Sequence, residues 1–110
     1  MEVSIEIKTF DGTLCSDLFE TRSLSRGLEK EIADGATIRF ESARIKEATG
    51  FPDTIQITLS FVSGFAASYL ANWLYAKLNG RATKIRIDRQ EIEIDRGKIK
   101  KVLREKIEIE

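Results

Sequence analysis

Apolar and polar residues alternate in five stretches of the chain, the pattern of a β-strand with one buried face. In the first stretch, Val3, Ile5 and Ile7 alternate with polar neighbours. The pattern predicts strands near residues 3–8, 37–43, 54–61, 84–88 and 91–94. The polar stretch from Glu47 to Pro52 is predicted to be a loop.

The isoleucines of the last two stretches change phase, from odd positions (Ile85, Ile87) to even positions (Ile92, Ile94). One uninterrupted strand would place these pairs on opposite faces of the sheet. We therefore expect a hairpin that reverses at residues 89–90 and sets Ile87 opposite Ile92. A β-bulge is the alternative, because neither Gly nor Asn occupies the turn.

Three helical segments are predicted between and after these strands. The first combines a turn over residues 14–19 with a short amphipathic helix, in which Leu24, Leu28 and Ile32 recur every four residues before Gly35. The second covers residues 63–78, and the third follows Asp95 as N-cap. The order β-α-β-β-α-β-β-α predicts a single two-layer domain over residues 1–110, an α/β fold of the α+β type with about five strands.

Residues 54–76 contain no charged side chain, which raises the question of a membrane span. The period changes inside this run, from alternation up to Phe61 to a three-to-four spacing after Val62. A strand that passes into a helix cannot cross a bilayer unless protein surrounds it. We therefore expect no membrane span.

The helix predicted over residues 63–78 is apolar on two flanks. Phe65, Tyr69 and Trp73 form an aromatic flank, and Leu70 and Leu74 belong to an aliphatic one. One sheet face covers less than half of such a helix, so the rest must meet another helix or another protein. The sequence thus predicts a homodimer or a partner contact through these five residues. Burial of both flanks in the core, one of them against the closing helix, is the competing interpretation.

Composition narrows the possible chemistry. The chain has 110 residues, no histidine and one cysteine, Cys15. Ser-His and Cys-His nucleophile pairs are therefore absent from the chain, and a zinc site lacks ligands. We predict no catalytic, metal-binding or cofactor-binding residues, and no enzyme activity. A lone cysteine and an opening strand in place of a signal peptide predict a cytoplasmic location.

Charge is balanced overall, with 18 basic and 18 acidic residues, but the closing helix is rich in lysine. A nucleic-acid-binding module that contacts phosphates through this helix is the alternative function. Acidic residues interleave with the cations, and no aromatic residue follows Tyr75, which favours a solvated helix face instead. The cations concerned are Lys98, Lys100, Lys101 and Arg104.

A resemblance to a known family, like the apolar helix, implies a contact with another protein. The run from Phe65 to Leu74, followed by residues 77–81 and the basic strand 84–87, resembles the effector-associated constant-component domains of prokaryotic conflict systems. The resemblance covers residues 54–94 and implies a non-catalytic adaptor that docks onto another protein. It assigns no functional residues. The predicted function is therefore a protein-interaction or scaffold domain.

Overall fold

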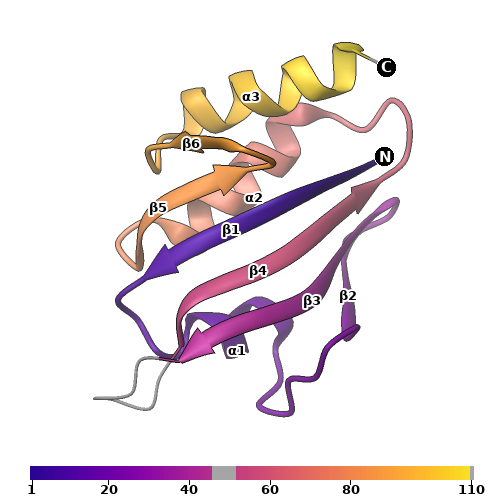
Figure 1. Ribbon diagram of the computed structural model, residues 1–110. Helices are drawn as coiled ribbons and strands as arrows, with labels where there is room; N and C mark the ends of the chain where they lie inside the picture. Colours follow the sequence, from indigo (N-terminus) through magenta and orange to yellow (C-terminus); the bar gives the residue numbers. More distant parts are fainter. Residues whose placement is uncertain (46–51, 110) are drawn as a thin grey trace.

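The fold is a six-stranded antiparallel sheet with three helices, seen in a computed structural model that describes residues 1–45 and 52–109 (Figure 1). The strand order is β2-β3-β4-β1-β5-β6, so the first strand of the chain lies inside the sheet. The predicted α+β class is confirmed, with one strand more than expected. The strands are β1 (Glu2–Thr9), β2 (Glu29–Ala33), β3 (Ala36–Ile45), β4 (Pro52–Phe61), β5 (Ala82–Ile87) and β6 (Gln90–Ile92).

The helices are α1 (Leu14–Phe19), α2 (Ala67–Leu78) and α3 (Arg96–Ile109). Figure 1 shows α1 and α2 behind the sheet and α3 running along α2 next to β6. The other face of the sheet has no helix over it in the described part of the chain. This asymmetry follows from the alternation of apolar and polar residues, because only one face of each strand is apolar.

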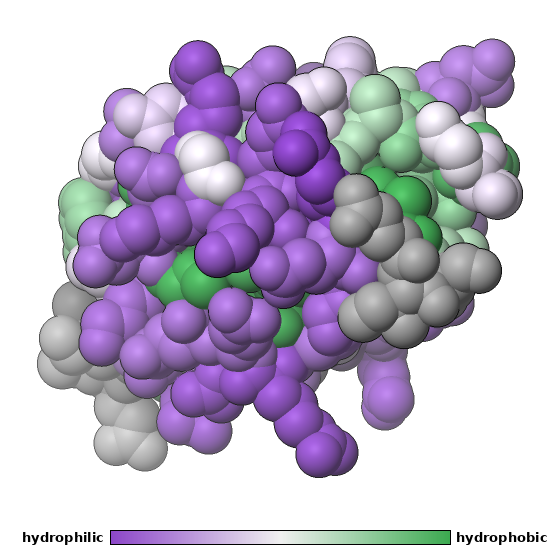
Figure 2. All heavy atoms as spheres, turned by 90° about the horizontal axis from the view of Figure 1, so that it is seen from above, coloured by the Kyte–Doolittle hydropathy of each residue, from purple (hydrophilic) through white to green (hydrophobic). Residues whose placement is uncertain are grey.

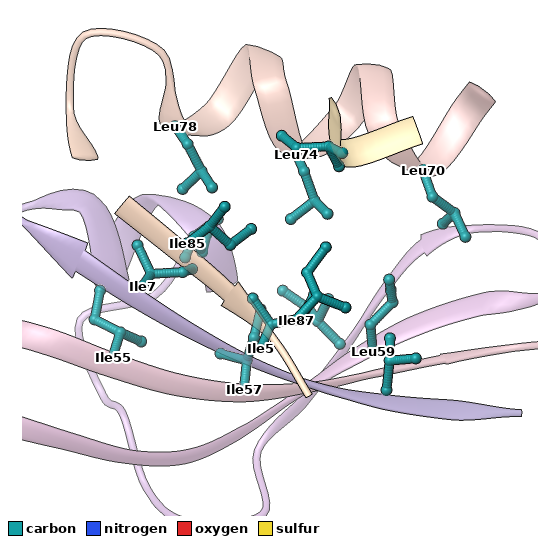
Figure 3. Close-up of a cluster of buried hydrophobic side chains, with 14 of the residues drawn as sticks. Ile5, Ile7, Ile55, Ile57, Leu59, Leu70, Leu74, Leu78, Ile85 and Ile87 are labelled. Carbon is teal, nitrogen blue, oxygen red and sulfur yellow. The ribbon is translucent and has the colours of Figure 1, made fainter. Parts of the chain in front are cut away.

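The core lies between the sheet and α2. Leu70, Leu74 and Leu78 point from α2 toward isoleucines of β1, β4 and β5 (Figure 3). The register places Ile5 between Ile57 and Ile87, and these side chains are fully buried. Alternating positions on three neighbouring strands thus form one continuous apolar surface for the helix.

Residues 24–32 do not form the predicted amphipathic helix. Residues 29–33 are strand β2, which pairs with β3 across the turn at Asp34 and Gly35. Gly35 has φ +91°, a left-handed conformation that glycine adopts without strain. A four-residue spacing fits a strand as well as a helix, because every second residue of a strand lies on the same face. The turn at Asp34 and Gly35 and the hydrogen bonds to the edge of β3 favour the strand.

The predicted hairpin at the end of the sheet is confirmed, but its predicted register is wrong. Ile87 lies opposite Gln90, and Ile92 lies opposite Ile85, so the turn consists of Asp88 and Arg89. Asp88 adopts φ +54°, which aspartate tolerates better than most residues. The phase of the isoleucines fixes which faces match, but it allows registers that differ by two residues, and the turn accordingly lies one residue earlier than predicted.

The helix predicted from residue 63 begins at Ala67, after a turn in which Gly64 has φ +85°. Residues 54–61, predicted as a strand, lie within β4. The predicted loop 47–52 falls almost wholly outside the described residues. In the described parts of the chain, every helix is too short or too polar to cross a membrane.

Candidate interaction surface at the start of helix α2

Helix α2 turns its aliphatic side to the sheet. Leu70 and Leu74, both predicted as interaction residues, have no exposed surface. Ala71 and Leu78 are buried on the same side. A partner cannot reach these side chains without opening the fold, so any contact through α2 must use other residues.

Helix α3 covers one flank of α2. Ile99 and Leu103 are fully buried and Val102 nearly so, while Ile107 packs partly against the core. The guanidinium of Arg96 lies 4.9 Å from the centre of the Tyr75 ring, a cation–π geometry between the two helices. The closing helix of the chain therefore takes the place of a partner on this flank.

The aromatic flank of α2 is only partly covered. The Phe65 and Tyr69 rings meet edge to face, with centroids 5.6 Å apart. Phe65 and Trp73 are half-buried against the core, and Tyr69 is 46% exposed. The Tyr69 hydroxyl lies 3.5 Å from the carbonyl oxygen of Ile32, at the limit of a hydrogen bond, so this flank faces β2.

Val62 extends this flank beyond the helix. Its side chain is 57% exposed in the connection between β4 and α2. The side chains of Val62 and Phe65 both approach Gly35, at 2.9 and 3.6 Å from the position a Cβ would take there. We call Val62, Phe65 and Tyr69 the end patch, because they gather at the end of the sheet where β4 leaves it.

A shallow hollow of about 170 Å³ adjoins the end patch. Polar and apolar groups line it in similar measure, and they come from the N-terminus, the β4-to-α2 connection and α3, with Met1, Val62 and Ile107 among the residues. Figure 2, which looks down on α3, shows a mostly hydrophilic surface with hydrophobic residues gathered at the same end, where Figure 1 places this connection.

The predicted phosphate-contacting residues lie on α3. Lys98, Lys101 and Arg104 are exposed and follow each other every three residues, whereas Lys100 is half-buried. Lys98 forms an ion pair with Glu93 at 3.1 Å. The structure thus places three of the four cations on the solvent-exposed side of α3.

An ion-pair network fixes α1 against the start of β5. The Arg81 guanidinium donates to Asp11 and to Asp17, each at 2.6 Å, and to the Thr13 hydroxyl at 3.0 Å. The Thr13 side chain and N–H, together with Arg81, hold the pKa of Asp11 down at about 2. The donors and acceptors of these side chains bond to one another, so the network joins α1 and the residues before it to the start of β5.

Cys15 lies inside α1 and is 1% exposed. Burial raises the pKa of its thiol to about 11. The thiol is therefore neutral at physiological pH, and a reagent in solution does not reach it.

Comparisons of the chain with protein-family models, with curated proteins and with solved structures give no match. The candidate surface therefore rests on geometry alone. Sequence reasoning found its two aromatic members but missed Val62, which the end of the strand pattern could have marked. An apolar residue that follows the last buried position of a strand, just before a glycine turn, has no sheet face to enter.

Proposed function

We propose that this protein is a non-catalytic interaction domain that self-associates, or docks a protein partner, through the end patch. The observation that carries the proposal is the exposure of Val62 and Tyr69 on either side of the half-buried Phe65. Exposed large apolar side chains that lie together mark interaction sites more often than scattered ones do. Leu70 and Leu74 support the patch from below rather than contact the partner.

The shape of the patch supports a contact between two copies. The β4-to-α2 connection contains Gly64, and a Cβ built there would meet nothing within 4 Å, so another backbone can approach closely. In a two-fold dimer the same patch serves both subunits, and one aromatic pair packs against its counterpart. The resemblance of residues 54–94 to effector-associated constant-component domains supports an adaptor role. A lone cysteine supports a cytoplasmic location as part of this proposal.

The test is light scattering of the purified chain at about 5 to 200 μM, a range that covers moderate dimer affinities. We expect the mass to rise toward that of a dimer, and Tyr69→Glu and Val62→Glu to restore the monomer, because a charge at the centre of an apolar contact weakens it strongly. Phe10→Glu is the matched control, since Phe10 is 68% exposed at the opposite end of β1. It should leave the dimer intact.

If the parent chain stays monomeric, a pulldown with the parent, Tyr69→Glu and Phe10→Glu proteins tests whether a protein partner binds the end patch. Loss of a captured protein from the Tyr69→Glu sample, but not from the Phe10→Glu sample, supports docking. Equal capture by all three, together with a monomeric parent, contradicts the proposal. Binding that weakens steeply with salt and depends on Lys98, Lys101 and Arg104 would instead favour the nucleic-acid alternative.

A further inference from the structure

The uncovered face of the sheet carries a row of cations at one end. The register aligns Arg44 with Thr54, Thr54 with Lys8, and Lys8 with Lys84, across β3, β4, β1 and β5. The three charged side chains of this row are exposed. Neighbouring strands lie about 4.8 Å apart, so the row is about 14 Å long. Arg86 lies two residues further along β5, on the same face.

Lys8 and Lys84 face each other directly, and like charges at such positions destabilise a sheet. Nearby carboxylates neutralise the cluster only weakly. The closest approaches to it are Glu91 to Lys84 and Glu6 to Arg86, both at 3.7 Å. Several other cations of the protein are paired at hydrogen-bond distance, as in Lys30 with Glu20 at 2.8 Å.

A hollow lies beside the row. Its volume is about 580 Å³, and residues of four strands line it, including Ser42, Gln56, Arg44, Arg86 and the carboxylate Glu6. The hollow is open to solvent and its lining is mainly polar, so a ligand would lie on the sheet face and be held by polar and charged groups. Ser42 and Gln56 contact each other only at 3.5 Å, so both can bond a ligand's polar groups.

We propose that this end of the open sheet face binds a small organic phosphate. The phosphate groups would lie on Lys8, Lys84, Arg44 and Arg86, and the rest of the ligand would occupy the hollow beside Gln56. The charge of the site favours an anion, because four cations face two carboxylates, Glu6 and Glu91. Bound phosphate would also relieve the repulsion between the two lysines.

The surroundings of the row favour a short ligand over a polynucleotide. Glu91 on β6 lies opposite Arg86, next to the row, and the other end of the same face carries Glu2 and Glu31. A nucleic-acid strand that continued past the row would meet these carboxylates. A ligand about as long as the row would not.

The test is a titration of the isotope-labelled chain with inorganic tripolyphosphate and with adenosine monophosphate, followed by amide shifts in nuclear magnetic resonance spectra. We expect saturable shifts on β1, β4 and β5 around Lys8, Thr54 and Lys84. Lys8→Gln and Lys84→Gln should each raise the dissociation constant about tenfold or more, because each removes a charged hydrogen bond to phosphate. Lys101→Gln, the same change on the outer side of α3, should leave it within about twofold.

A stability measurement separates loss of binding from loss of fold. Lys84→Gln should melt at the same temperature as the parent or higher, since it removes the repulsion with Lys8. The proposal is overturned if neither probe gives saturable shifts, if Lys101→Gln weakens binding as much as Lys84→Gln, or if a short single-stranded oligonucleotide binds more tightly than adenosine monophosphate.

Discussion

Lys106 of α3 donates to the carboxylate of Asp88 at 2.8 Å and thereby ties the closing helix to the β5–β6 turn. The same carboxylate accepts the Ser4 N–H at 3.0 Å, and the Asp88 N–H donates to the Ser4 carbonyl at 2.7 Å. Burial alone would raise the pKa of Asp88, but the bonds from Lys106 and Ser4 outweigh it and lower the pKa. One turn residue therefore joins β1, the hairpin and α3.

We expect Asp88→Ala to lower the free energy of unfolding by about 1–3 kcal/mol, because it leaves the Ser4 N–H without its side-chain acceptor and Lys106 unpaired. Asp88→Asn should lower it less, since asparagine keeps an acceptor and tolerates the left-handed conformation. Urea denaturation measures both. An equal loss in the two variants would show that charge alone matters here.

The depth of α2 in the core gives a second prediction. Leu74→Ala should lower the free energy of unfolding by about 2–5 kcal/mol, as buried leucine truncations do. Tyr69→Ala should lower it by about 1 kcal/mol or less, since nearly half of that side chain is exposed. Chemical denaturation at low protein concentration keeps self-association out of the comparison. Similar losses would mean that the end patch belongs to the core.

The Asp11 network predicts a response to acid. Its carboxylate keeps a pKa of about 2 in the fold, while an aspartate in an unfolded chain titrates near 3.9. Between these values the unfolded state binds more protons than the folded state. The contribution of Asp11 to the free energy of unfolding is therefore fully present above about pH 4, and it is lost as the pH falls toward 2. Asp11→Asn removes this carboxylate, so the free energy of unfolding of the variant should fall less between pH 4 and 2 than that of the parent protein. Thermal melts at a series of pH values measure the difference.

Asp95 supports the start of α3. Its carboxylate accepts the Lys98 N–H at 2.9 Å, the bond of an N-cap residue. Asp95→Ala should lower the free energy of unfolding by about 1 kcal/mol, whereas Asp95→Ser, which preserves a capping oxygen, should lower it by less. Amide hydrogen exchange in the first turn of α3 should quicken in the alanine variant. Unchanged exchange there would contradict a capping role.

The sequence predicts those parts of the fold in which local pattern and tertiary environment agree. The alternation around Ile5 and Ile57 predicts strands because the same residues lie on the buried face of the sheet. The interval of four from Leu24 to Ile32 suits both a helix and a strand, and only pairing with β3 decides between them. The sequence of residues 24–32 alone does not show that this segment pairs with β3.

The candidate surfaces were predictable to different degrees. The aromatic flank of α2 follows from helical spacing, but whether Leu74 or Tyr69 faces solvent depends on where the sheet and α3 lie. The alignment of Arg44, Lys8 and Lys84 in one row was not predicted. Its members are far apart in the chain, and only the register of four strands brings them into line.

The position of β1 inside the sheet has a consequence for folding during synthesis. β1 pairs with β4 on one side and with β5 on the other, and Ser4 bonds to Asp88, 84 residues later. Contacts over such separations form slowly, because a long loop must close before they contribute. β1 is synthesised before β5 and must wait for it, and until then the edge of β1 that pairs with β5 is unpaired. A nascent chain in this state exposes the kind of edge that chaperones protect.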